Sequence, residues 1–138
     1  MRKVRDIMSA APVCMAPGES VSAAARAMKQ QGTGTVLVLT DGRVSGLVTD
    51  RDITVRVLAE NRDPRTTSIG DICGSELVVL GPDDDLALAS RLVRDHAVRR
   101  IPVLREGTPV GVVSVGDLAL ESGATSVLSG ASSAPPNV

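Results

Sequence analysis

The sequence contains no phenylalanine, tyrosine or tryptophan among its 138 residues. Hydrophobic residues still make up 43% of the chain and charged residues 22%, which is typical of a globular protein. The hydrophobic core must therefore be built from aliphatic side chains. A bound nucleobase would lie between aliphatic groups, because no aromatic ring is available for stacking.

Cysteine and histidine are almost as scarce. Cys14 and Cys73 are the only thiols and His96 is the only imidazole, so one chain cannot supply the four ligands of a structural zinc site. Two cysteines in this setting are typical of reduced thiols in a cytoplasmic protein, with a redox-linked pair as the alternative. We expect a cytoplasmic protein that has no metal site and requires no cofactor.

The sequence also lacks an excess of one charge and any long hydrophobic run. The 15 Lys and Arg residues nearly balance the 16 Asp and Glu residues, which argues against a broadly basic face for nucleic acid. No apolar run approaches the roughly 18 residues of a membrane span. The first residues lead into a polar segment, which is unlike a signal peptide. We expect a soluble protein without nucleic-acid or membrane partners.

What the sequence does contain is a repeat. The stretch GLVTDRDI (46–53) returns as GVVSVGDL (111–118), an offset of 65 residues, which is the difference between 111 and 46. The same offset, without an insertion, pairs Asp6 with Asp71, Ile7 with Ile72, Val13 with Val78, Pro17 with Pro82, and Gly42 with Gly107. A repeat at a fixed period predicts two similar units that pack on each other to bury a shared core.

The repeat suggests how the chain is divided. We expect a first repeat with an N-terminal lead-in over residues 1–61, a polar linker over 62–68 and a second repeat over 69–122. Residues 123–138 are rich in Ser, Ala, Gly and Pro and poor in large apolar side chains. Such a composition cannot order itself by burying apolar surface, so this tail is expected to be disordered.

Each repeat shows the pattern strand, helix, strand, strand, helix. In the first repeat the signals are an extended Val13–Met15, a helix capped by Ser20 and ended by Gly32, a hairpin turn at Asp41-Gly42, and a helix from Thr49 that buries Ile53, Val57 and Leu58. In the second they are a strand over Val78–Leu80, a helix capped by Asp85, strands over 101–104 and 110–113, and a helix from Ser114. The fold class expected is α/β, of the α+β kind.

These motifs resemble those of a tandem pair of CBS domains, also called a Bateman module, over residues 4–122. The two repeated stretches and HAVRRIPV (96–103) carry the resemblance, and the layout is similar to stand-alone bacterial CBS-pair proteins of the hypoxic-response type. The resemblance implies two repeats related by a pseudo-twofold axis, with adenosine-containing ligands bound in clefts between them. It also implies pairing of two chains into a homodimer.

Two short motifs have both a structural and a functional interpretation. Thr49 and Ser114 each precede an aspartate by three residues, the spacing of a capping box at a helix start. A carboxylate there repels phosphate but can accept hydrogen bonds from both hydroxyls of a ribose. The resemblance assigns this ribose role to Asp52 and Asp117, and the residues leave capping alone, or capping with ligand binding, both open.

Three arginines are candidate phosphate contacts, although a single arginine is more often a solvated surface residue. Arg99 and Arg100 directly precede an apolar run, and the counterpart of Arg100 in the first repeat is Thr35. Arg51 follows the first motif, and its counterpart is Gly116. We therefore expect two chemically unequal ligand sites. Phosphate would be held by Thr49, Ser114, Arg51 and Arg100, with Arg99 as a further candidate. Adenine would be held by the backbone near Val13 to Met15 and Val78 to Leu80, and Pro102 is a further ligand-binding candidate.

The sequence offers little support for catalysis. No phosphate-binding loop, nucleophile elbow or pair of catalytic acids is visible, and His96 is best interpreted as a residue at a helix end. The function predicted is a non-enzymatic regulatory module that binds AMP, ADP or ATP and signals to an unknown partner protein. The alternatives are a ligand-free dimerisation module and a thiol enzyme or redox switch that uses Cys14.

Overall fold

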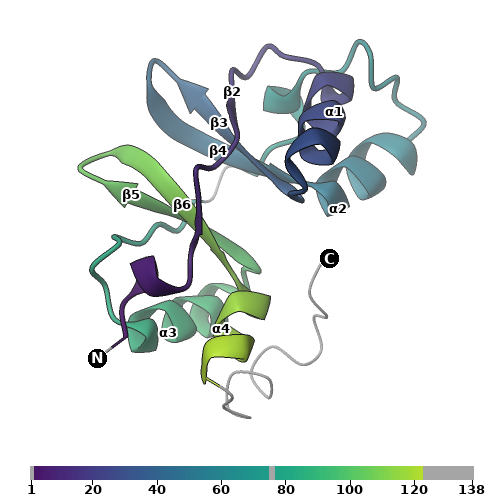
Figure 1. Cartoon of the computed structure of the whole chain (residues 1–138). Coiled ribbons are helices and arrows are strands. Elements are labelled where there is room, and N and C mark those ends of the chain that lie inside the picture. The colour runs from purple at the N-terminus through teal and green to yellow at the C-terminus, as the bar shows by residue number, and fades with distance from the viewer. Residues whose placement is uncertain (1, 75–76, 123–138) are drawn as a thin grey trace. The chain divides into compact units, whose positions relative to one another are not determined.

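The computed structural model describes residues 2–74 and 77–122 (Figure 1). The chain forms two compact units, one of residues 12–77 and one of residues 1–11 together with 78–138. We call them the central unit and the composite unit. The tail over 123–138, for which the sequence predicts disorder, lies outside the described residues.

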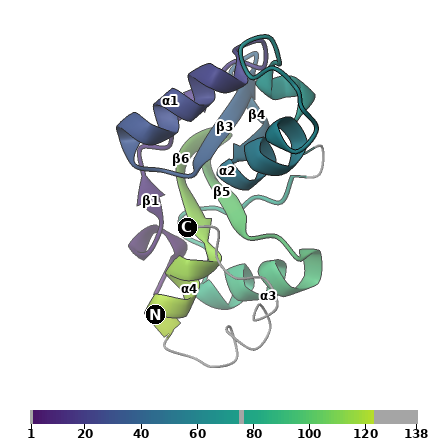
Figure 2. The ribbon, with the colours of Figure 1, turned by 90° about the vertical axis from the view of Figure 1, so that its right-hand side faces the viewer.

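The central unit is a three-stranded sheet with its helices on one face (Figures 1 and 2). Its strand order is β2-β3-β4, in which β2 runs parallel to β3 and β3 antiparallel to β4. The elements are β2 (Cys14–Met15), α1 (Val21–Gln31), β3 (Thr35–Thr40), β4 (Arg43–Thr49), α2 (Asp50–Ile53), the π-helix η2 (Thr54–Leu58) and the 3-10 helix η3 (Ile69–Asp71). Its buried core is aliphatic and draws on α1, β3, β4, η2 and η3.

The composite unit has a second three-stranded sheet, with the order β1-β6-β5 and antiparallel pairing throughout. Its elements are the 3-10 helix η1 (Val4–Asp6), β1 (Ser9–Ala10), α3 (Leu86–His96), β5 (Arg100–Arg105), β6 (Thr108–Ser114) and α4 (Val115–Ser122). Helices α3 and α4 contact each other, and Ala89, Val93 and Leu118 bury their side chains with those of β5 and β6. The expected α/β class with two sheets is confirmed.

Several local signals in the sequence are confirmed. Ser20 caps α1 by accepting a hydrogen bond from the Ala23 N–H at 3.1 Å, and Gly32 ends the helix in the left-handed conformation with φ of 66°. Asp41 and Gly42 have φ of 52° and 79° between β3 and β4. Two successive residues with positive φ form the turn that matches the twist of a two-residue hairpin. The hairpin between β5 and β6 is built in the same way.

Three expectations about elements were wrong. Val78–Leu80 is not a strand, and only Leu80 forms an isolated parallel bridge, with Val103. Leu58 is 59% exposed although Val57 is fully buried, because adjacent helical residues point about 100° apart. Asp85 stands at the N-cap of α3 without a capping hydrogen bond, and its carboxylate bonds to Lys3 Nζ at 3.0 Å instead.

The compact units do not coincide with the repeats, because the lead-in of each repeat, residues 4–8 in the first and 69–73 in the second, packs with the other repeat. The Val4 and Arg5 N–H groups donate to the carbonyls of Asp84 and Pro82, both at 2.9 Å, and Val4 is fully buried in the composite core. The second lead-in mirrors this, since Ile69 and Gly70 donate to Glu19 and Pro17, again at 2.9 Å. Each unit is therefore completed by a segment from the start of the other repeat.

The expected linker over 62–68 is part of the central unit. The Val21 N–H donates to the Thr67 carbonyl and the Ser22 N–H to the Pro64 carbonyl, both at 2.9 Å. Thr67 is only 6% exposed. These bonds satisfy backbone donors in the first turn of α1 that have no partner within the helix. Among the described residues, no helix is long and apolar enough to cross a membrane.

Candidate functional site

The first candidate motif lies where β4 ends and α2 begins. The Thr49 N–H donates to Asp52 Oδ2 at 2.8 Å, and the Asp52 N–H donates to Thr49 Oγ1 at 3.2 Å. These reciprocal bonds form a capping box, which satisfies two backbone donors at once. The Thr49 hydroxyl also lies 3.1 Å from Asp52 Oδ2, to which it donates its proton. The capping interpretation of this motif is therefore confirmed.

The second candidate motif repeats this geometry where β6 ends and α4 begins. The Ser114 N–H donates to Asp117 Oδ2 at 2.9 Å, and the Asp117 N–H donates to Ser114 Oγ at 3.1 Å. Among contacts of the described residues, the Ser114 hydroxyl has no acceptor of its own. Within the described residues the two motifs therefore differ, because Thr49 donates its hydroxyl proton to the capping carboxylate and Ser114 does not.

Arg99 and Arg100 lie beside the second motif. Arg100 is directly opposite Ser114 in the ladder between β5 and β6, so the two side chains share one face of the sheet. The Arg99 carbonyl accepts a hydrogen bond at 2.9 Å from the N–H of Val115, the first residue of α4. Both arginines are partly buried. Arg100 thus shares a face of the sheet with Ser114, which bonds to Asp117, and the Arg99 backbone adjoins the start of α4.

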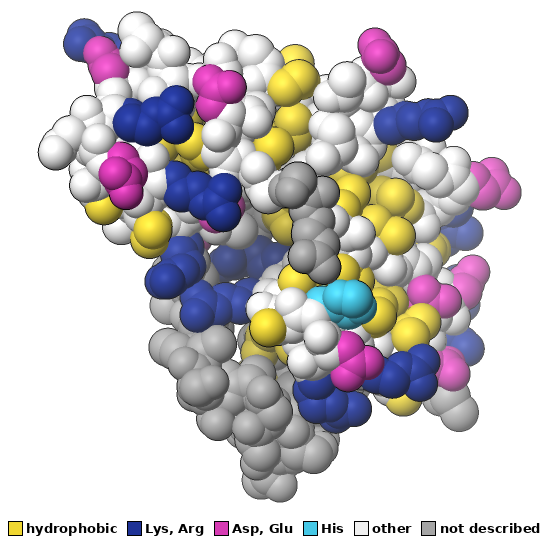
Figure 3. Space-filling model, turned by 180° about the vertical axis from the view of Figure 1, so that it is seen from behind, with side chains coloured by type: hydrophobic (Ala, Val, Ile, Leu, Met, Phe, Trp, Pro, Cys, Tyr) yellow, Lys and Arg dark blue, Asp and Glu magenta, His cyan; other side chains and the backbone are white. Residues whose placement is uncertain are grey.

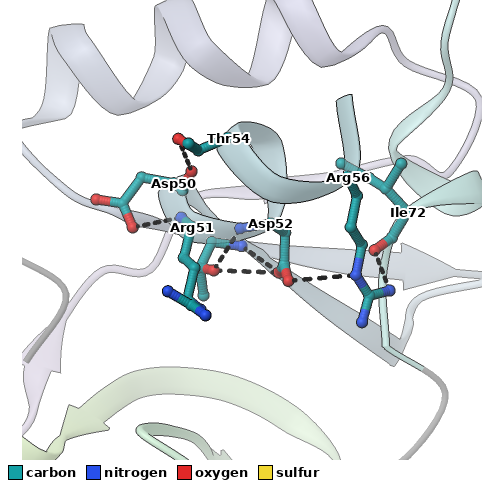
Figure 4. Close-up of polar contacts among 7 residues, drawn as sticks. Asp50, Arg51, Asp52, Thr54, Arg56 and Ile72 are labelled. Carbon is teal, nitrogen blue, oxygen red and sulfur yellow. Dashed lines mark hydrogen bonds and ion pairs between the residues drawn. The ribbon is translucent and has the colours of Figure 1, made fainter. Parts of the chain in front are cut away.

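The corresponding place in the central unit has a different charge distribution. Thr35 stands opposite Thr49, and the Gly34 carbonyl accepts from the Asp50 N–H at 3.0 Å. Arg51 is exposed, and in Figure 4 its guanidinium extends away from Asp52. The cation at this motif is therefore on the helix instead of on the facing strand.

The residues expected to meet adenine are already engaged within the fold. The Val13 carbonyl accepts from the Leu37 N–H at 2.8 Å, and Met15 pairs with β3. Leu80 is 2% exposed and donates to the Pro102 carbonyl at 3.1 Å, while its own carbonyl accepts from Leu104 at 2.8 Å.

Both backbone groups of Leu80 are thus occupied, and Pro102 is buried. Val78 packs against the composite core outside any strand. An adenine contact here would have to use the partly buried Val13, Met15 and Val78, or the backbone edge of β2 that does not face β3.

One charged residue of this region was not singled out from the sequence. Arg56 Nε lies 3.8 Å from Asp52 Oδ1, and Arg56 Nη1 donates to the Ile72 carbonyl at 2.9 Å (Figure 4). The spacing of four residues between Asp52 and Arg56 on a helix is the signal that could have found the ion pair. The bond to Ile72 had no such signal, because the two residues are distant in sequence.

The thiols of Cys14 and Cys73 belong to the central unit, and the imidazole of His96 belongs to the composite unit. His96 is exposed, and Figure 3 shows its imidazole at the surface. Cys14 is an exposed residue, yet partial desolvation raises the pKa of its thiol, which disfavours the reactive thiolate. Cys73 is partly buried. Within residues 2–74 and 77–122 there is no group of three or more His, Cys, Asp or Glu side chains that could hold a metal ion.

Comparison with protein families gives a match to the CBS domain over residues 4–59 and again over 69–123. The CBS domain-containing protein YhcV of Bacillus subtilis is 36% identical over 120 residues, which cover 87% of this chain and 85% of YhcV. Hypoxic response protein 1 of Mycobacterium tuberculosis is 32% identical over 120 residues, covering 86% of this chain and 84% of that protein.

Solved structures give the same match. A crystal structure of Hypoxic Response Protein I with two coordinated zinc ions has a TM-score of 0.72 at 32% identity and covers 88% of this chain and 99% of that one. The CBS domain pair of protein MJ0100, solved in complex with 5′-methylthioadenosine and S-adenosyl-L-methionine, has a TM-score of 0.78 at 21% identity. The match covers 88% of this chain and 96% of that one. At 21% identity it shows only that the two chains share a fold.

Proposed function

Because the chain belongs to the CBS domain family and carries two CBS domains in tandem, we propose that it is a regulatory module which binds an adenosine nucleotide, AMP, ADP or ATP. Binding changes the surface or geometry that the module presents to another protein. The proposal includes no catalytic step. A cytoplasmic location, predicted from the cysteine content, fits this role and stays a prediction.

The observation that carries the proposal is the pair of capping carboxylates at the same place in both repeats. Asp52 uses Oδ2 for both of its capping bonds, so Oδ1 lies outside the box. An ionised carboxylate has about four acceptor positions and can accept from both hydroxyls of a ribose. The MJ0100 domain pair, whose fold this chain shares, binds adenosine compounds that also carry a ribose, and we propose the same ligand class for this chain.

The phosphate assignment favours the second motif. Among contacts of the described residues the Ser114 hydroxyl donates to no acceptor, and Arg100 lies opposite Ser114, directly after Arg99 in the sequence. In the first motif, the Thr49 proton is already donated to Asp52, so a phosphate there depends on Arg51. We propose that the two sites differ, and that the second binds the more highly charged ligand.

The function is tested by replacing Asp52 and Asp117 with alanine, singly and together. Loss of a cap costs about 0.5–2 kcal/mol of stability whether or not ligand is present. A ligand at a hundred times its dissociation constant adds about 2.7 kcal/mol, and loss of the ribose contact removes that increment. We expect melting curves with and without AMP to show both losses for Asp52→Ala and Asp117→Ala.

Asp63→Ala is the matched control for this experiment. Asp63 is an exposed residue that pairs with Arg65 at 3.3 Å, and this neighbour lowers the pKa of the Asp63 carboxyl. Its removal is expected to leave the AMP-induced shift in melting temperature unchanged. If that shift survives the double replacement of Asp52 and Asp117, the ribose assignment is wrong.

Two other functions make different predictions. A ligand-free dimerisation module would give no saturable heat when adenosine nucleotides are titrated by calorimetry. A thiol enzyme or redox switch would need Cys14 to react faster than a free cysteine. The raised pKa of Cys14 predicts the opposite, since less thiolate is present at neutral pH.

We also propose that the protein forms a homodimer. Ala25 and Arg26 of α1 are exposed, and alanines along this helix leave a face of small side chains. Leu58 and Val55 of η2 add exposed apolar area at 59% and 44%. Sedimentation analysis at tens of micromolar is expected to give the mass of two chains, and a monomer at that concentration would contradict the proposal.

A further inference from the structure

Arg56 joins two parts of the central unit that belong to different repeats. On one side its Nε faces Asp52 Oδ1 at 3.8 Å, and on the other its Nη1 donates to the Ile72 carbonyl at 2.9 Å (Figure 4). Asp52 is part of the first repeat's ligand motif. Ile72 belongs to the lead-in of the second repeat.

The segment held by Arg56 is closely packed. Ile69 and Ile72 are 0% and 1% exposed within the aliphatic core, and the partly buried Cys73 packs against the same core. A Cβ built on Gly46 of β4 would lie 2.9 Å from Cys73 Sγ, so the thiol rests directly on the strand. Any local opening of the segment therefore exposes the Cys73 sulfur.

We propose that Arg56 is a positioning residue that couples ligand occupancy at Asp52 to the seating of residues 69–73. The inference rests on the proposed function, because it takes Asp52 as a ribose contact. Oδ1 is the carboxylate oxygen outside the capping box and also the one that Arg56 faces. A ribose hydroxyl that donates to Oδ1 fixes the carboxylate, which in turn fixes the guanidinium and its bond to Ile72.

The coupling is restricted to one of the two motifs. By the 65-residue offset, the counterpart of Arg56 is Glu121, and the counterpart of Ile72 is Ile7. The glutamate side chain has no N–H group, so the sequence of the second repeat offers no equivalent of the bond from Arg56 to a carbonyl. A ligand bound near Asp52 therefore affects the packing of residues 69–73, and a ligand bound near Asp117 has no equivalent effect on residues 4–8.

The test uses the alkylation rate of Cys73 in a Cys14→Ser background, with iodoacetamide as the probe. Arg56→Ala is expected to raise the rate roughly tenfold, because a charged hydrogen bond that holds the segment is lost. Asp52→Asn is also expected to raise it. Because both act through one contact, the double variant reacts no faster than Arg56→Ala alone. If the effects of Arg56→Ala and Asp52→Asn on the Cys73 alkylation rate multiply in the double variant, the two residues act independently and the proposed coupling is wrong.

Two variants separate coupling from a merely structural role. Arg62 lies 4.0 Å from Asp71 in the same segment and belongs to a different ion pair. The effect of Arg62→Ala is therefore expected to multiply with that of Asp52→Asn, unlike the effect of Arg56→Ala. Arg56→Lys keeps the charge and is expected to restore part of the protection.

A second arm adds AMP or adenosine. Either compound is expected to slow Cys73 alkylation several-fold in the Cys14→Ser parent and to leave the rate in Arg56→Ala unchanged, although the melting shift shows that it still binds. Equal protection in Arg56→Ala would overturn the inference. If neither compound shifts the melting temperature of any variant, the proposed function fails, and the ligand-free cycle still decides whether Arg56 and Asp52 act together.

Discussion

Replacing Arg100 with alanine should weaken AMP binding by about ten- to a hundredfold and barely change adenosine binding. A hydrogen bond to a charged group contributes about 1.5–3 kcal/mol, which corresponds to that range in affinity. Arg100 lies opposite Ser114 in the sheet, and the Ser114 hydroxyl belongs to the capping box of the second motif. Adenosine has no phosphate and therefore does not depend on the guanidinium.

The experiment titrates AMP, ATP and adenosine into the wild type, Arg51→Ala and Arg100→Ala at two salt concentrations. Arg105→Ala is a further control, because Arg105 is an exposed arginine at the far end of the same strand. The phosphate contribution is expected to shrink at high salt. Equal weakening of AMP and adenosine by Arg100→Ala would show that the arginine shapes the site without touching phosphate. Two identical sites in the wild type would refute the asymmetry.

Replacing Gly111 with alanine should destabilise the fold by about 1–3 kcal/mol, the usual cost of forcing an extra group into a packed core. A Cβ at this position would lie 2.6 Å from Met8 Sδ and 2.9 Å from the Ser9 carbonyl oxygen. The methionine can move, but Ser9 is fixed by the pairing of β1 with β6. The added methyl group therefore strains the pairing of β1 with β6, which holds the N-terminal segment to the composite unit.

Denaturant unfolding of three variants measures this effect. Gly18→Ala is the matched control, because nothing lies within 4 Å of its Cβ, and we expect little change in its free energy of unfolding. Adding Met8→Ala to Gly111→Ala should recover the part of the loss that comes from the sulfur. A Gly111→Ala variant as stable as Gly18→Ala would contradict the close approach of the lead-in.

The features that the sequence predicted well are those set by neighbouring residues. Ser20 and Gly32 bound α1 because capping depends on groups three or four residues away. Asp41-Gly42 forms the hairpin because positive φ is a local property of the turn. Thr49 and Asp52 form the capping box for the same reason. The even spacing of the two repeats then carried the hairpin turn and the capping box to the second half.

The features that the sequence did not predict depend on groups far along the chain. Asp85 was expected to cap α3, but its carboxylate accepts a hydrogen bond from the ammonium group of Lys3 instead. Of the strand expected over Val78–Leu80, only Leu80 pairs with β5, through an isolated bridge. The contact of Arg56 with Ile72 was missed because the two residues are far apart in the sequence and no local pattern indicates it. The ligand contacts expected at Asp52, Asp117 and the arginines remain predictions.

The exchange of lead-ins has a consequence for how such a protein can be assembled. A single repeat that carries only its own lead-in would lack the segment that fills its core, as Val4 and Ile69 do here. Two separate copies could complete each other, but only at concentrations high enough for them to meet. Joining them in tandem makes the encounter intramolecular, so completion no longer depends on concentration. The two repeats thus exchange segments within one chain, as two subunits do in a domain-swapped dimer. Cleaving the chain between the repeats would separate each core from the segment that completes it.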